Sequence, residues 1–289
     1  MPGGLPQKIN KGSFLMSLSF EGIDTHAHIF RHDLPMASDR RYSPDYDALA
    51  EHYLGHLDRC SLAQGVLIQP SFLGTDNRFM VEALQRYPQR LRGIAVVEPD
   101  IEDAQLQALA KAGVVGIRLN LIGKAPQDYI DARWQTFYQR LARLGWQVEI
   151  QCGFDALVLV VPFVLASGVT VVVDHFGLPS NGIDPSNLAH QGFLALLGED
   201  RLWVKLSAAY RSQSDLPRAA CVLAQLRQAC GGIDRFVWGS DWPHTQFESR
   251  TGYDAQLAFV HALFPDPVER RQVLVDNPTT LFGFAASTR

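Results

Sequence analysis

Eight short runs rich in valine, isoleucine and leucine recur along the chain, and stretches with helical spacing of apolar residues separate them. Most of these runs are continuously apolar rather than alternating, which is typical of parallel strands covered on both faces. Eight strands alternating with helices predict an α/β fold of the (β/α)8 TIM-barrel type in a single domain. The strands are expected at residues 22–26, 65–69, 93–97, 114–120, 147–152, 170–175, 202–207 and 235–241.

A doubly wound open sheet is the structural alternative. It would place a glycine-rich phosphate loop after the first strand, where this chain has "THAHIF" instead. We therefore expect the barrel over residues 20–289 and a loose leader over residues 1–19. The leader has no cleavage pattern of a signal peptide. Near the other end, Asn277 followed by Pro278 predicts the N-cap and first residue of a final helix.

The composition argues against several kinds of partner. A net charge of −4 and a pI of about 6.1 provide no basic field for nucleic acid. The longest apolar run, residues 157–173, is interrupted by Pro162 and by Ser167-Gly168, so we expect a helix and a strand and no membrane span. Four widely separated cysteines favour a reducing, cytoplasmic setting. The sequence leaves open whether the protein is a homo-oligomer.

The polar residues that follow the strands are the candidates for chemistry, because active sites of such barrels lie at the C-terminal ends of the strands. His26 and His28 end the first strand, two residues apart and therefore on the same side. His175 follows the sixth strand and Asp241 the eighth. Two histidines in one strand occur often by chance and are commonly core residues. Four such groups on three separate strands indicate a site that barrel closure assembles.

Other polar side chains at strand ends have two interpretations. Instead of a role in chemistry, Lys205 could form an ion pair inside the barrel. Asp174 and Gln69 could form hydrogen bonds to loop backbone. The remaining candidates are Ser71, Arg118, Asn120, Gln151, Ser207, Arg211, Ser240 and His244.

Three segments, "DTHAHIF", "VVVDHFG" and "VWGSDWPH", resemble the strand-one, strand-six and strand-eight motifs of the amidohydrolase superfamily. The resemblance extends over roughly residues 20–285 and is closest to the branch that includes 2-pyrone-4,6-dicarboxylate lactonase. It implies a hydrolase that opens the lactone ring of a small anionic substrate by base-assisted attack of water. A metal-dependent sugar lactonase or decarboxylase of the same superfamily is the nearest alternative. A non-catalytic barrel that binds a dicarboxylate is the alternative of another class.

The resemblance also implies roles for single residues. Asp241 is expected to be the general base, with His26, His28 and His175 as the other catalytic residues. We expect these histidines to be protonated, to hold Asp241 ionised and to polarise the substrate carbonyl. Five further residues match substrate-binding positions of the lactonase or stand in their place: Arg118, Lys124, Arg211, Ser71 and His244.

The chain departs from the family pattern at several of these positions. Lys124 replaces an arginine, Gln151 a tyrosine and Leu73 a histidine of the lactonase, so the resemblance does not determine the substrate. Binuclear members of the superfamily have a carboxylated lysine or a glutamate at strand four, where this chain has Arg118, which cannot ligate a cation.

No metal is favoured, because the charge of Arg118 repels a cation and the lactonase branch is understood to work without one. If a divalent ion such as zinc or manganese is bound, its ligands would be His26, His28 and Asp241, with His175 as a further candidate.

Overall fold

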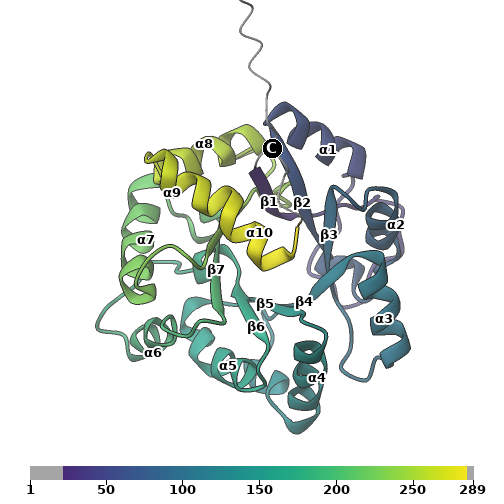
Figure 1. Ribbon diagram of the computed structural model, residues 1–289, viewed down its shortest axis with the longest axis horizontal. Coiled ribbons are helices and arrows are strands. Elements are labelled where there is room, and N and C mark those ends of the chain that lie inside the picture. Colours follow the sequence, from purple (N-terminus) through teal and green to yellow (C-terminus); the bar gives the residue numbers. More distant parts are fainter. Residues whose placement is uncertain (1–21, 285–289) are drawn as a thin grey trace, which may run out of the picture.

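The computed structural model describes residues 22–284, which form a barrel of eight parallel strands surrounded by helices (Figure 1). Each strand pairs with the next in sequence order, as a (β/α)8 barrel requires. The barrel prediction is confirmed, whereas the expected leader at residues 1–19 lies outside the described residues. The strands are β1 (Gly22–Ala27), β2 (Leu62–Ile68), β3 (Leu91–Ala95), β4 (Val114–Asn120), β5 (Gln147–Gln151), β6 (Thr170–Val173), β7 (Leu202–Ser207) and β8 (Phe236–Gly239).

The helices lie on the outside of the strands and bury their apolar faces against them (Figure 1). Several of the segments that follow the strands contain short 3-10 turns. These turns include η1 (Ser71–Leu73), η2 (Pro126–Tyr129), η3 (His175–Gly177) and η4 (Ala209–Ser212). The helices are α1 (Ala50–Arg59), α2 (Arg78–Arg86), α3 (Asp103–Ala112), α4 (Ala132–Arg143), α5 (Phe154–Ala166), α6 (Leu188–Leu196), α7 (Leu216–Cys230), α8 (Tyr253–Leu263), α9 (Pro267–Arg271) and α10 (Asn277–Phe282).

The seam between β1 and β8 closes the barrel and brings the motif after the first strand against the motif after the last. Asp241 N donates to His26 O at 2.8 Å, and His28 N donates to Trp242 O at 2.7 Å. Gly239 permits this approach, because a Cβ at that position would lie 2.4 Å from the Cβ of His26. Any larger residue at position 239 would therefore push Asp241 away from the histidines.

Asp24 reinforces the same seam from below. Its buried carboxylate accepts hydrogen bonds from Ser240 N at 2.8 Å, from Ser240 Oγ at 2.6 Å and from Tyr253 Oη at 3.0 Å. Buried polar groups are stable only when they are paired in this way. Ser240, a candidate from its place after the eighth strand, is therefore a structural residue that joins β8 to β1.

The last helical segment closes the other end of the barrel. Helix α10 crosses that end, and Phe282 packs with Ile23, Val66 and Ile94 in a small apolar cluster inside it (Figure 1). The segment is continuous with α9 through a π-helical turn, η5 (Gln272–Asp276). The predicted N-cap at Asn277 is therefore wrong. Asn277 is itself helical, and its side-chain amide donates instead to Ile233 O and Phe236 O, both at 2.7 Å.

The longest apolar run divides as expected into α5 and β6, with the break at Ser167 and Gly168. Pro162 does not break it, because this proline lies inside α5. Among residues 22–284, no helix combines the length and the hydropathy that a bilayer span requires.

Candidate active site

His28 presents an unprotonated nitrogen to the centre of the site. Its Nδ1 lies 2.8 Å from Ile68 O. A carbonyl oxygen can only accept, so Nδ1 carries the proton and the Nε2 of the neutral ring has a free lone pair. That Nε2 lies 3.7 Å from Asp241 Oδ1. Two acceptors therefore face each other across a gap that suits one small polar group.

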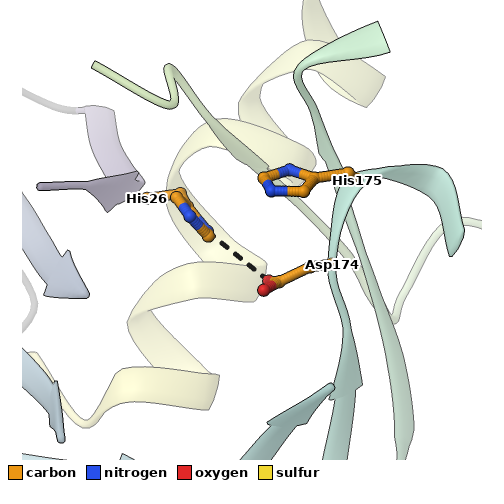
Figure 2. A group of neighbouring side chains, drawn as sticks. All are labelled: His26, Asp174 and His175. Carbon is orange, nitrogen blue, oxygen red and sulfur yellow. Dashed lines mark ion pairs between the residues drawn. The ribbon is translucent and has the colours of Figure 1, made fainter. Parts of the chain in front are cut away.

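His26 has the opposite arrangement of its two ring nitrogens. Its Nδ1 lies 3.1 Å from the ammonium of Lys205, and Asp174 Oδ1 lies 3.4 Å from the same nitrogen (Figure 2). The two partners make opposite demands, because a carboxylate oxygen needs an N–H at Nδ1, whereas an ammonium has no lone pair and needs Nδ1 to accept. The contact with Lys205 is the shorter of the two and favours an accepting Nδ1 and a proton on Nε2. The Nε2 of His26 lies 3.7 Å from Asp241 Oδ1. His26 thus directs an N–H toward the same gap.

His175 approaches from the start of η3, directly after β6 (Figure 2). Its ring lies 4.7 Å from that of His26, and its Nδ1 lies 2.8 Å from Ser207 Oγ. Its Nε2 lies 4.0 Å from Asp241 Oδ1. The backbone of His175 has φ of 55°, in the left-handed region that a non-glycine residue seldom adopts. This conformation turns the ring inward from the end of the strand.

Asp241 is the carboxylate that all three histidines surround. Its Oδ2 accepts from Arg211 Nε at 2.7 Å and from the hydroxyl of Tyr210, whereas its buried Oδ1 has no hydrogen-bond partner among the described residues. Burial alone would raise the pKa of Asp241, but Arg211 and the neighbouring histidines hold it well below its usual range. One oxygen is therefore fixed while the other, ionised, faces the histidines.

The ionisation of the histidines differs from our expectation. Burial lowers the pKa of His26 well below its usual value, lowers that of His28, and lowers that of His175 to about 3. The three rings are therefore neutral near pH 7, and each can donate from only one nitrogen. Arg211, rather than protonated histidine, is the main group that holds Asp241 ionised.

A buried ionic network lies beneath the histidines. Lys205, on β7, is fully buried and pairs with Glu149 of β5 at 2.7 Å, which confirms the ion pair expected inside the barrel. Asp174 pairs with Arg118 Nε at 3.0 Å, rather than bonding to loop backbone as expected. Gln69 does bond to loop backbone, donating to Gly74 O and Asp76 O. The network orients His26 through Lys205.

A cavity of about 200 Å³ opens above Asp241 at the C-terminal ends of the strands. His28, His175 and Asp241 line it, and so do three of the predicted substrate-binding residues: Ser71, Arg118 and Arg211. The other two predicted contacts do not line it. Lys124 lies outside the cavity, and His244 is buried with its Nδ1 3.3 Å from Tyr210 Oη.

Sequence reasoning missed several residues that line the cavity or support it. Arg41 and Tyr42 belong to the connection between β1 and α1, and Thr245, Gln246 and Phe247 to the one between β8 and α8. Tyr210 and Glu149 were missed for different reasons. Tyr210 lies on η4 beside the predicted Arg211, and Glu149 sits in the middle of an apolar strand. A charged residue within such a strand was the one signal available for Glu149.

Two overlapping groups of these side chains have the spacing to hold a divalent ion: His26, His28 and Asp241, and His26, Asp174 and His175. His26 Nε2, His175 Nε2 and Asp241 Oδ1 are buried without hydrogen-bond partners among residues 22–284, and His28 Nε2 lies 3.7 Å from Asp241 Oδ1. Imidazole nitrogen and carboxylate oxygen are ligands that zinc accepts. The positive charge of Arg118 was the reason to expect no metal ion. Arg118 is paired with the carboxylate of Asp174, and the negative charge of Asp174 partly offsets its repulsion of a metal ion. A metal would require His26 to release the proton from Nε2.

Comparison with known proteins shows which chains this one is similar to. The amidohydrolase family model matches residues 23–284. The chain is 32% identical to the 2-pyrone-4,6-dicarboxylate hydrolase of Comamonas testosteroni, covering 97% of this chain and 96% of that protein. It is 30% identical to the 4-sulfomuconolactone hydrolase of Rhizobium radiobacter, covering 90% and 89%.

A solved structure gives the same picture at the level of the fold. A probable 2-pyrone-4,6-dicarboxylic acid hydrolase of Acinetobacter baumannii, crystallised with citric acid bound, superposes with a TM-score of 0.87. The two chains are 38% identical, and the match covers 91% of this chain and all of the other.

Proposed function

Because the chain belongs to the amidohydrolase family, we propose that it hydrolyses the lactone ring of a small dianion of the 2-pyrone-4,6-dicarboxylate type. The observation that carries the proposal is the buried Oδ1 of Asp241, which has no hydrogen-bond partner among the described residues and is surrounded by three histidines at a cavity lined by arginines. A carboxylate in this state can take a proton from water, and the arginines suit an anionic substrate.

The attacking water sits between Asp241 Oδ1 and His28 Nε2. Both atoms accept, and their separation of 3.7 Å lets one water donate a hydrogen bond to each. His26 Nε2–H donates to the same water, which leaves one lone pair of the oxygen free. The three side chains therefore fix both protons of the water and direct its nucleophilic electron pair into the cavity.

The oxyanion is stabilised from the other side of the cavity. In the proposed tautomer the Ser207 hydroxyl, 2.8 Å from His175 Nδ1, donates to that nitrogen, so that His175 Nε2 bears a proton and can donate to the lactone carbonyl. Arg118 uses Nε and one Nη2 hydrogen on Asp174 and Gln151, and its Nη1 donates to no described residue. Donors that are already oriented toward developing negative charge lower the barrier most.

The protons and electrons balance through Asp241. Water adds to the carbonyl carbon while its proton passes to Asp241 Oδ1, and a tetrahedral oxyanion forms. The oxyanion then collapses and breaks the bond between the carbonyl carbon and the ring oxygen. Asp241 returns the proton to that ring oxygen, which leaves an open-chain acid and regenerates the carboxylate.

We propose that the reaction proceeds without a metal ion. The support is the contact of Lys205 Nζ with His26 Nδ1 at 3.1 Å, which favours a proton on Nε2, the nitrogen that a metal would need. If a divalent ion binds, His26, His28 and Asp241 would hold it, with His175 as a further candidate, and it would supply Lewis-acid polarisation of the carbonyl.

Steady-state assays on a substrate panel test the proposal. The panel contains 2-pyrone-4,6-dicarboxylate, 4-sulfomuconolactone and a neutral aldonolactone, each followed by acid release in a pH indicator assay. We expect turnover of at least one of the two dianions and much less of the neutral lactone. Preference for the neutral lactone would favour a sugar lactonase. Binding of the dianions without turnover would favour a non-catalytic barrel.

A further inference from the structure

The cavity contains a third arginine that the sequence pattern did not indicate. Arg41 lies in the segment between β1 and α1, and its side chain lines the cavity together with Arg118 and Arg211. Lys124, the expected third cation, does not line it. The third cation at the cavity therefore comes from the connection after β1, and not from the connection after β4 as expected.

The three arginines differ in how much of their charge is already used. Arg118 is paired with Asp174 at 3.0 Å, and Arg211 is paired with Asp241 at 2.7 Å. Each of these arginine–aspartate pairs has a net charge close to zero and therefore attracts an entering anion only weakly. Among residues 22–284, none forms a hydrogen bond or an ion pair with the side chain of Arg41. Arg41 is thus the lining cation whose charge no described carboxylate offsets.

The backbone on both sides of Arg41 is held in place although its side chain is free of partners among residues 22–284. Tyr42 Oη lies 2.9 Å from Thr245 Oγ1, which ties this segment to the connection after β8 across the cavity. Arg40 donates to Ser43 Oγ at 2.6 Å and to Ala37 O at 2.9 Å. Because its neighbours are anchored, the backbone of Arg41 is held beside the cavity, and its exposed side chain is left to contact a ligand there.

We propose that Arg41 binds the second carboxylate of the substrate, the one remote from the lactone carbonyl, and thereby selects dianions over monoanions. A guanidinium matches a carboxylate with two parallel N–H···O bonds, which a lysine at the same position cannot make. The inference rests on the proposed function for the identity of the substrate, but the contact itself can be measured without turnover.

Calorimetric binding of isophthalate and benzoate tests this proposal. Isophthalate carries two carboxylates in the 1,3 arrangement of a pyrone-4,6-dicarboxylate, and benzoate carries one. We expect Arg41→Ala to weaken isophthalate binding by about 10- to 100-fold, the range for hydrogen bonds to a charged group, and to leave benzoate binding unchanged. Arg41→Lys should recover part of the lost affinity, because lysine restores the positive charge but lacks the two parallel N–H donors of a guanidinium.

Two further variants complete the design. Arg133→Ala removes an exposed arginine of α4 outside the cavity and should change neither affinity. Lys124→Ala should also leave both unchanged. Loss of isophthalate binding in Lys124→Ala but not in Arg41→Ala would overturn the proposal in favour of Lys124. Equal loss of both ligands in Arg41→Ala would overturn selection of the second carboxylate, as would a wild-type protein that does not bind isophthalate.

The proposed reaction can fail separately from this contact. Wild-type protein that binds isophthalate through Arg41 but opens no dianionic lactone would refute the lactonase and leave the role of Arg41 intact. Turnover of 2-pyrone-4,6-dicarboxylate with an unchanged KM in Arg41→Ala would refute the role of Arg41 and leave the lactonase intact. Where both hold, Arg41→Ala should raise KM for the dianion with kcat retained, as expected for lost uniform binding.

Discussion

The Nε2 of His28 and the Oδ1 of Asp241 lie 3.7 Å apart, and both are hydrogen-bond acceptors. Two lone pairs that face each other in a buried site repel unless a proton donor or a cation lies between them. Water satisfies both atoms and is at the same time the reagent of a hydrolase. The pair thus positions the nucleophile as well as activating it.

Replacement of Asp241 by asparagine tests its role as the base. The amide retains an oxygen that can accept from Tyr210 and Arg211, so the variant should fold, but it cannot take a proton from water. We expect kcat to fall by at least about 10²-fold, in line with the contribution of a general base. Initial rates measure the loss, and a thermal unfolding curve shows whether the fold is kept. An Asp241→Asn enzyme that keeps most of its activity would rule out this base.

The pH dependence of kcat/KM should change when Arg211 is replaced by glutamine. Burial raises the pKa of Asp241, and Arg211 is the main group that lowers it again, so its removal should raise that pKa. Activity requires the ionised form and is lost as the pH falls through the pKa. The acid limb should therefore move to higher pH in Arg211→Gln and return toward the wild-type position in Arg211→Lys. An unchanged acid limb in Arg211→Gln would show that another group titrates.

Acid should destabilise the fold as the pH falls below about 6.5. Four buried histidines, His26, His28, His175 and His244, have a pKa below the ordinary value because burial disfavours their charged form. The unfolded chain then binds protons that the folded chain does not. Their contribution to stability is complete above the unfolded pKa and decreases by about 1.4 kcal/mol per pH unit for each net proton.

Two buried carboxyls act in the opposite direction over part of this range. Burial raises the pKa of Glu149 to about 7 and that of Asp24 above its usual value. The contribution of these two carboxyls to the free energy of unfolding therefore decreases as the pH rises. The four histidines outnumber them, and the free energy of unfolding should fall as the pH is lowered from about 6.5 to about 4.5. Urea unfolding at several pH values measures the slope, and His175→Gln should reduce it. A stability that is constant over this range would contradict the neutral state of the buried histidines.

Removal of metal tests whether the histidines act as hydrogen-bonding groups. Because Lys205 contacts His26 Nδ1, we expect protein dialysed against a chelator to retain its activity and to contain much less than one equivalent of zinc or manganese by elemental analysis. Activity that disappears on chelation and returns with one equivalent of added zinc would show that the enzyme uses a catalytic ion instead, for which His26, His28 and Asp241 are the candidate ligands.

Much of the site could be predicted because its residues follow strands. The apolar runs before His26, His175 and Asp241 identify three strands, and the ends of parallel strands meet at one face of a barrel. Residues in the connecting segments could not be placed in the same way. Arg41 and Lys124 are both cations in loops, and no periodicity relates either of them to the cavity.

By itself the amino-acid sequence predicted the eight strands, the barrel and the gathering of three histidines and an aspartate at one end of it, since apolar strand runs are local and strand ends converge by a general rule. Only the tertiary structure decided how these groups are used. Burial in it lowers the pKa of the histidines, its contacts favour His28 as an acceptor and His26 as a donor, and Arg41 rather than Lys124 reaches the cavity. Those properties depend on burial and on partners distant in sequence, which no short segment specifies.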